Sequence, residues 1–382
     1  MIYIEEDKEE EKNEMLDDEE VNLHQVDQHF YFDANGCEQV YGNQLCVLED
    51  VGPVFHYGGD TLLENNATMG AFIKLVNSMK NEKPLPLFSK NGLIPAKYSN
   101  LLSDMSQIVA FYDLFYNKVA FHPYVEAVMK LSPFLLSEIQ FYQHLYPLHV
   151  VQARKFDSNA YAAINNVVYN YLAIVKSEAV RKRVDNIQRG VRENTASINS
   201  HFKALLSNHA SLLVIRLDLS YMARQKDVGR LSHVTLEDIV KDKKDFLKAV
   251  EKKFQDFLGY VFKLEFGPKK GYHYHCILYF DGSKLRADGL VSQVLASIWK
   301  DVTQERRGVT FLCNLHKRDY IHLAIGSIHY SEKDKIKNFR YIAEYFSKND
   351  LFSCVKRNGK RSLEKSQVKP KTSSRGRPRA IG

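Results

Sequence analysis

The sequence contains few cysteines, and they form no pairing pattern. Five cysteines, an odd number, are scattered over 382 residues without a Cys-x-x-Cys pair. This predicts a reducing compartment and no structural zinc site. No apolar run reaches the roughly 18 residues that a membrane-spanning helix needs, and the acidic start of the chain has the wrong charge for a secretory signal. We therefore expect a cytoplasmic protein with no membrane partner.

A phosphate-binding loop of the ATPase kind is also absent. The sequence has no match to Gly-x-x-x-x-Gly-Lys-[Ser/Thr], so we expect no ATP hydrolysis through such a loop. The hydrophobic content of 45% is ordinary for a folded soluble protein. The length allows one large domain or two modest ones.

Charge is distributed unevenly along the chain, whose formal net charge is +7. Residues 1–30 carry twelve acidic and two basic side chains, and residues 351–382 carry ten Lys or Arg and one Glu. We expect a disordered acidic head over residues 1–29 and a disordered, basic, DNA-binding tail over residues 351–382.

The tail contains the sequence Arg-Gly-Arg-Pro-Arg, in which Arg375, Arg377 and Arg379 alternate with Gly376 and Pro378. This resembles the core of an AT-hook, an arm that lies in the narrow minor groove of A·T-rich DNA. Nonspecific binding to backbone phosphates is the alternative reading.

Between the head and the tail, the hydrophobic pattern changes near residue 200. Residues 30–200 are predicted to be mostly helical, because apolar residues recur at helical spacing in the blocks 69–79, 101–115, 124–130, 134–145 and 160–178. From residue 201 to 350, strands alternate with two or three helices. This pattern favours an α+β fold, with an antiparallel sheet and helices packed on it, preceded by the helical region.

The segment 261–280 predicts a β-hairpin with a metal site on one face. Gly267-Pro268 and Gly271 provide turn residues between two strand-like runs. His273 and His275 are two residues apart and so share a face of their strand. If opposed residue numbers sum to 538, Glu265 lies across from His273 with Cβ atoms roughly 5 Å apart.

Two imidazoles and one carboxylate then converge, with coordination positions left open for a phosphate oxygen. The donor set suits Mn²⁺, with Mg²⁺ as the abundant alternative. The other reading is that His273 and His275 are half-buried structural histidines.

A helix is predicted over Asp334–Lys348, with an apolar stripe on one face. Tyr341, Tyr345 and Lys348 lie at spacings i, i+4 and i+7 on roughly the opposite face. An amphipathic helix with two half-exposed tyrosines would also explain this pattern.

Together, the hairpin and helix resemble the HUH endonucleases, which carry a His-x-His pair and a Tyr-x-x-Lys helix. More closely, the stretches 212–221, 263–280, 298–300, 326–330 and 341–348 resemble the YagK/YfjJ C-terminal domain family, which includes replication initiators of filamentous phages and their prophage relatives. The resemblance covers about residues 205–350 and implies that residues 201–350 form an HUH endonuclease domain with an RRM-like core.

The resemblance implies a bacterial, site-specific single-strand DNA nickase and strand transferase that initiates rolling-circle replication of a phage, prophage or plasmid. Tyr345 would form a 5′-phosphotyrosine, Lys348 would stabilise the developing charge, and Tyr341 would be a second nucleophile or the true one. Origin DNA, both single-stranded and duplex, would be bound. A host helicase and polymerase would assist.

Two residues of the strand 212–221 look like a further motif of this family. Arg216 and Asp218 alternate on one face of the strand, where they could be structural, contact DNA or support the metal site. We assign Arg216 to DNA binding. A noncatalytic DNA-binding prophage regulator and an HUH transposase or plasmid relaxase are the alternatives for the whole protein.

Overall fold

The computed structural model describes residues 66–80, 96–145, 158–222, 234–267, 270–357 and 361–368, and two short strands, β1 (Phe30–Phe32) and β2 (Glu38–Val40). The predicted acidic head and the three arginines of the AT-hook-like motif, Arg375, Arg377 and Arg379, lie outside these residues. Among the described residues, no helix combines the length and the apolar character needed to cross a membrane.

The region before residue 178 is largely helical, as the hydrophobic spacing predicted. Its helices are α1 (Asn66–Met79), α2 (Ala96–Phe115), α3 (Pro123–Val128), α4 (Pro133–Leu145) and α6 (Ser158–Lys176). They enclose a core of their own, in which Phe72, Met105 and Tyr171 are fully buried. The short strand β3 (Val119–Phe121) lies between α2 and α3.

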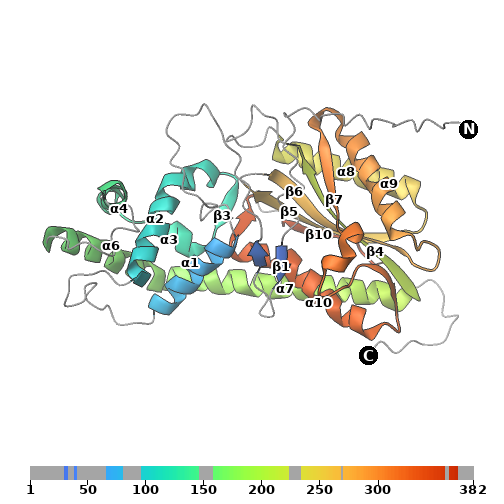
Figure 1. The fold of residues 1–382 in the computed structure, drawn as a ribbon, viewed down its shortest axis with the longest axis horizontal. Helices are drawn as coiled ribbons and strands as arrows, with labels where there is room; N and C mark the ends of the chain where they lie inside the picture. The colour runs from blue at the N-terminus through green and yellow to red at the C-terminus, as the bar shows by residue number, and fades with distance from the viewer. Residues whose placement is uncertain are drawn as a thin grey trace, which may run out of the picture.

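Helix α7 (Glu178–Asn208) runs from the helical region to the underside of a sheet (Figure 1). Its 31 residues span about 46 Å. Val180 and Val184 at its beginning pack in the helical core, whereas Phe202 and Leu205 near its end pack beneath the sheet. The predicted division at residue 200 therefore falls inside a continuous helix. The apolar side of α7 packs first in the helical core and then, nearer its C-terminal end, beneath the sheet.

The sheet has six strands in the order β10-β5-β6-β4-β7, and β8 also pairs with β4. Its strands are β4 (Ser211–Tyr221), β5 (Phe257–Gly267), β6 (Gly271–Asp281), β7 (Gly308–Leu312), β8 (Gly326–His329) and β10 (Leu363–Lys365). All the pairings are antiparallel. The predicted α+β class is confirmed.

Alternation along the strands gives the sheet two apolar faces, and each is covered by two helices (Figure 1). Helices α8 (Leu236–Lys253) and α9 (Asp288–Thr303) cover one face, and α7 and α10 (Lys333–Lys348) cover the other. Thr235 is the N-cap of α8 and forms a capping box with Asp238. Short 3-10 turns follow three of the elements: η3 (Gln304–Arg306), η4 (Cys313–Asp319) and η5 (Asn349–Leu351).

The residues that follow α10 belong to the fold, which contradicts the expectation of a disordered tail from residue 351. Strand β9 (Ser353–Val355) pairs with β3 of the helical region, and β10 extends the sheet next to β5. Glu364 in β10 accepts hydrogen bonds from Lys243 and Arg357. These three-residue strands are too short to show a period in the sequence, and their pairing depends on partners far away in the chain.

Candidate metal centre

The turn chemistry of the β5–β6 hairpin sets the register of the predicted ligands. Gly267 pairs with Gly271, and Glu265 pairs with His273, so the predicted sum of 538 is correct. Gly271 has φ +65°, a left-handed conformation that glycine adopts without steric cost. The even-numbered residues of β6, among them Tyr274 and Cys276, point into the core beneath α8 and α9. His273 and His275 therefore face the α7 and α10 layer.

Glu265, His273 and His275 form a cluster that could hold a metal ion, with their ligand atoms within 4.8 Å of one another. The Glu265 Oε2 atom lies 3.3 Å from His275 Nε2 and 3.7 Å from His273 Nε2. Both imidazoles are buried, and the carboxylate is only 11% exposed. The three donors therefore converge on one shielded point, as the sequence predicted.

The Nδ1 atom of each imidazole, on the side away from Glu265, lies within hydrogen-bond distance of an acceptor. His275 Nδ1 lies 2.6 Å from Asp218 Oδ1, and His273 Nδ1 lies 3.1 Å from the Gly271 carbonyl oxygen. When an ion is bound and the rings are neutral, these acceptors favour the proton on Nδ1, which leaves Nε2 to act as the ligand atom. Asp218 thus supports the histidine ligand, which is one of the three roles considered for it from the sequence.

The Glu265 carboxylate shows that this centre fits a cation. Its Oε2 accepts a hydrogen bond from the Asn349 side chain at 2.5 Å, whereas its buried Oε1 has no partner within the described part of the chain. A buried carboxylate oxygen without a partner is costly. A divalent ion bound by Glu265, His273 and His275 would satisfy it.

The electrostatics of the centre favour positive charge. Burial alone would raise the pKa of Glu265, but the His275 and His273 imidazoles hold that pKa well below its usual range. Burial lowers the pKa of His275, yet the carboxylates of Asp218 and Glu265 outweigh burial and raise it to about 9. Burial also lowers the pKa of His273. The two carboxylates therefore stabilise positive charge on the His275 ring, which lies between them.

Tyr345 lies beside this cluster, on the last full turn of α10. Its ring packs edge-on against the His275 ring, with centroids 5.3 Å apart and an interplanar angle of 87°. The Arg216 guanidinium lies over the Tyr345 ring, 4.2 Å from its centroid. The tyrosine of the Tyr-x-x-Lys motif and the His-x-His pair, 70 residues apart in sequence, are therefore neighbours in space.

The other two predicted catalytic residues lie on the same helix. Tyr341 stacks on His322 with centroids 3.7 Å apart, and its hydroxyl oxygen accepts a hydrogen bond from Arg340 at 2.6 Å. Its contacts thus differ from those of Tyr345. Lys348 is the last residue of α10 and is half-buried.

The structure places Arg216, predicted to bind DNA, between the sheet and α10, where it is only 7% exposed. Its Nε atom is buried and lacks a partner in the described residues. Because an arginine remains charged in proteins, it brings a permanent positive charge to Tyr345. DNA contact by Arg216 stays a prediction.

Asn349 is the functional residue that sequence reasoning missed. It directly follows the Tyr-x-x-Lys helix, and its side chain reaches Glu265 across 84 residues of sequence. An asparagine at a helix end is ordinary as a cap or turn residue, so the sequence contains no signal for this contact.

Comparison with known proteins gives one match. The family model of the YagK/YfjJ C-terminal domain matches residues 175–363, which include the cluster and α10. No curated protein and no solved structure matches the chain.

Proposed function

We propose that this protein is a metal-dependent, site-specific single-strand DNA endonuclease that nicks and joins its substrate through a 5′-phosphotyrosine at Tyr345. The observation that carries the proposal is the packing of Tyr345 against His275 of the cluster at 5.3 Å. A phenol that neighbours both a candidate metal centre and a buried arginine has the surroundings that nucleophilic attack on a phosphodiester needs.

Glu265, His273 and His275 would hold the ion, for which Mn²⁺ or Mg²⁺ suits the mixed nitrogen and oxygen donors and a phosphate ligand. When bound, such an ion supplies positive charge to the phosphate oxygens as a Lewis acid. Asp218 keeps the His275 ring oriented, and Asn349 holds one oxygen of Glu265.

The reaction is a transesterification in which one ester bond replaces another. A bond forms between the Tyr345 phenol oxygen and phosphorus, the bond from phosphorus to the 3′-oxygen breaks, and the phenol proton is balanced by protonation of the released 3′-hydroxyl. The Arg216 guanidinium, 4.2 Å from the Tyr345 ring centroid, stabilises negative charge developing on the phenol. Lys348, three residues further along α10, positions or neutralises the phosphate.

Tyr341 is the alternative nucleophile or a second one, one helical turn before Tyr345. Its hydroxyl accepts a hydrogen bond from Arg340, and its ring stacks on His322 rather than on a ligand of the cluster. These contacts favour Tyr345 for the first strand transfer.

The biological setting that we propose is initiation of rolling-circle replication of a phage, prophage or plasmid in the bacterial cytoplasm. The 3′-hydroxyl released by the nick primes a host polymerase. A host helicase separates the strands, since the sequence contains no ATPase loop of its own.

The test is to incubate the purified full-length chain with single-stranded DNA from its own replicon, with Mn²⁺ or with EDTA, and to run a denaturing protein gel. With metal, a 3′-end label should shift to the protein band, because the 5′-phosphate of the downstream fragment is attached to Tyr345. A 5′-end label should remain on a shortened free oligonucleotide.

Two conservative variants identify the nucleophile. Tyr345→Phe should form no adduct, and Tyr341→Phe, which loses a hydroxyl on the same helix face, should retain it. Tight DNA binding without an adduct on any tested strand would favour the noncatalytic regulator. Preferential cleavage at the tips of DNA hairpins would favour the transposase.

A further inference from the structure

The face of the sheet that carries the metal ligands continues past β4 to the edge strand β7. His275 of β6 lies opposite Asp218 of β4, and Asp218 lies opposite Phe311 of β7. Directly opposed residues share one face of an antiparallel sheet, so these three residues form a row across three strands. Because adjacent strands are about 4.8 Å apart, Phe311 lies two strands, or roughly 10 Å, from the position of His275.

The helices that cover this face leave the β7 side of it partly open. Leu212 and Val214, at the other end of β4, are fully buried beneath α7 and α10. Phe311 and Val309, which lie on the same face of β7, are only partly buried, as is Ser220 of β4, which pairs with Val309. A partly open strip of mostly apolar surface therefore begins next to the metal ligands and ends at the edge of the sheet.

An aromatic stack lies at the outer end of this strip. The His316 imidazole of η4 packs on the Phe311 ring, with centroids 4.9 Å apart and an interplanar angle of only 13°. The His316 side chain is 40% exposed, so the stack presents ring surface to solvent. Proteins that bind single-stranded DNA use such rings as surfaces on which bases stack.

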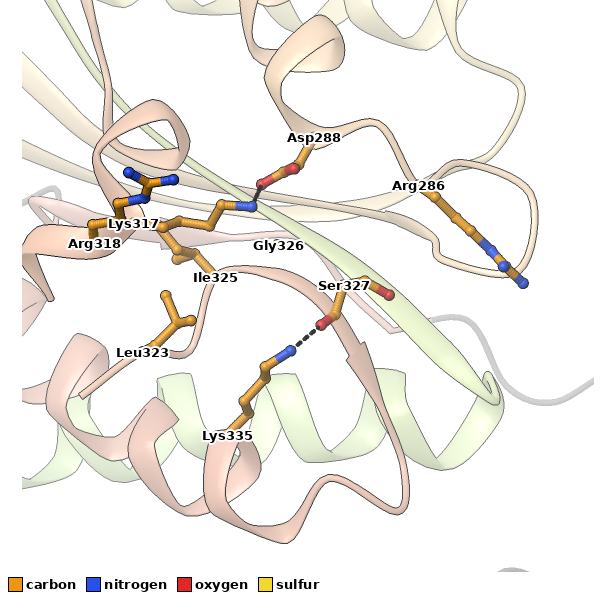
Figure 2. A pocket seen from close by; sticks show the side chains of 9 residues that line it. All are labelled: Arg286, Asp288, Lys317, Arg318, Leu323, Ile325, Gly326, Ser327 and Lys335. Carbon is orange, nitrogen blue, oxygen red and sulfur yellow. Dashed lines mark hydrogen bonds and ion pairs between the residues drawn. The ribbon is translucent and has the colours of Figure 1, made fainter. Parts of the chain in front are cut away.

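The turn that carries His316 is anchored on both sides. Before it, Asn314 accepts a hydrogen bond from the Arg216 backbone N–H of β4 at 2.9 Å. After it, Lys317 pairs with Asp288 at 2.7 Å in a pocket of about 450 Å³ (Figure 2). The imidazole is thus presented by a fixed segment of backbone, and a preorganised surface loses less conformational freedom when it binds a ligand.

The inner end of the strip adjoins the proposed nucleophile. Arg216 lies on the same face of β4 as Asp218, and its guanidinium is 4.2 Å from the Tyr345 ring centroid. Tyr345 in turn packs against His275, the first residue of the row. A DNA strand whose phosphate reaches Tyr345 can therefore continue along the strip towards β7. The row of about 10 Å corresponds to roughly three stacked nucleotides at the spacing of one DNA strand.

We propose that the Phe311–His316 stack is a platform for a nucleobase of the single-stranded DNA substrate, within roughly three nucleotides of the phosphate that Tyr345 attacks. This inference rests on the proposed function for its substrate. Phe311 and His316 are positioning residues, since they determine where the strand lies on the sheet and take no part in cleavage. The platform should accept any base, because every base has a flat face.

The experiment measures binding of two fluorescent 20-nucleotide strands to the full-length chain by anisotropy, in EDTA and over a range of salt concentrations. One strand is oligothymidine, and the other has the same sugar–phosphate backbone without bases. The test variant is His316→Ala, and His316→Phe restores a ring at the same position. The matched control is His329→Ala, which removes a partly buried imidazole that packs on Tyr330 beside the opposite end of β4.

His316→Ala should bind oligothymidine about tenfold more weakly than the wild type, as expected for the loss of one stacked base. Its affinity for the strand without bases and the salt dependence of its binding should stay unchanged, because no phosphate contact is lost. His316→Phe and His329→Ala should match the wild type. An equal loss on both strands would overturn the proposal, and so would equal affinities of His316→Ala and His329→Ala for oligothymidine.

Adduct formation separates this proposal from the nickase itself. With Mn²⁺ and saturating replicon DNA, His316→Ala should still form the Tyr345 adduct. If the wild type forms no adduct but His316→Ala still binds oligothymidine more weakly, the nickase proposal fails while the platform stands. If the wild type forms the adduct and both proteins bind oligothymidine equally, the platform fails while the nickase stands.

Discussion

Asn349 donates its side-chain amide to Glu265 Oε2 at 2.5 Å, and this contact joins the end of the tyrosine helix to the candidate metal ligands. The next residue, Asp350, pairs with the buried Lys263 of β5 and accepts a hydrogen bond from Asn194 of α7. Two residues later, Phe352 enters the core of the helical region. A segment of four residues therefore links the site, the sheet and the N-terminal helices.

Replacing Asn349 with Ala should weaken this link. The variant removes a donor to a buried carboxylate, and such hydrogen bonds to charged groups contribute roughly 1.5–3 kcal/mol. We expect a loss of that order in the free energy of unfolding, measured by urea denaturation. Asn170→Ala is the control, since its side chain makes exposed contacts within α6. Equal losses in the two variants would show that the Asn349–Glu265 contact contributes nothing specific.

Asp218→Asn should weaken metal binding without removing a ligand. The Asp218 carboxylate accepts from His275 Nδ1 at 2.6 Å, so its loss frees the ring orientation and makes Nε2 a poorer donor. We expect a fall of roughly 10–100-fold in Mn²⁺ affinity, measured by isothermal titration calorimetry. Asp256→Asn, which loses an exposed contact to Lys284, is the control. An unchanged Mn²⁺ affinity in Asp218→Asn would show that Asp218 does not contribute to metal binding.

Phe352→Ala should destabilise the protein strongly. Phe352 lies in the helical core and is only 9% exposed. Truncating a buried Phe costs about 3–5 kcal/mol. Phe134→Ala is the matched control, because that ring is 64% exposed on α4 and should change stability by less than about 0.5 kcal/mol. Urea denaturation of both variants measures the difference. A small effect at Phe352 would mean that the helical region does not depend on the segment after α10.

His201 should make stability depend on pH. Its burial beneath the sheet, together with nearby Lys365, lowers its pKa to about 4, against an ordinary value of about 6.5. Between these values the unfolded chain binds a proton that the folded chain does not, so His201 contributes stability at neutral pH that is lost as the pH falls from about 6.5 to about 4.

Wild type and His201→Gln should therefore diverge in that window. The wild type should lose up to about 1.4 kcal/mol more per pH unit than the variant, measured by urea denaturation at each pH. His122, whose burial lowers its pKa to about 4, contributes equally to both proteins and cancels. Parallel pH profiles would show that His201 keeps an ordinary pKa in the folded protein.

Much of the site could be predicted because its parts are local. The register of Glu265 and His273 follows from the turn glycines, and the shared face of His273 and His275 follows from strand alternation. The predicted helix over Asp334–Lys348 begins at Lys333 and ends where expected.

The prediction of a disordered tail from residue 351 was wrong for the residues that form β9 and β10. A basic composition suggested disorder from residue 351, yet β9 and β10 pair with strands whose sequence positions are distant. The composition of a segment indicates how well the segment is solvated on average. It does not indicate whether a distant strand has a free edge with which the segment can pair.

By itself, the sequence determined the elements whose periods are short: the hairpin with its ligands, the amphipathic tyrosine helix and the α+β order of strands and helices. Only the tertiary structure decided that Tyr345 lies against His275, that Arg216 lies over Tyr345, and that Asp218 and Asn349 support the ligands. The reason is physical. Strand and helix geometry repeat every two or 3.6 residues, so they appear in the hydrophobic pattern of the sequence. Contacts between distant segments depend on how two faces pack, and they produce no periodic pattern in the sequence.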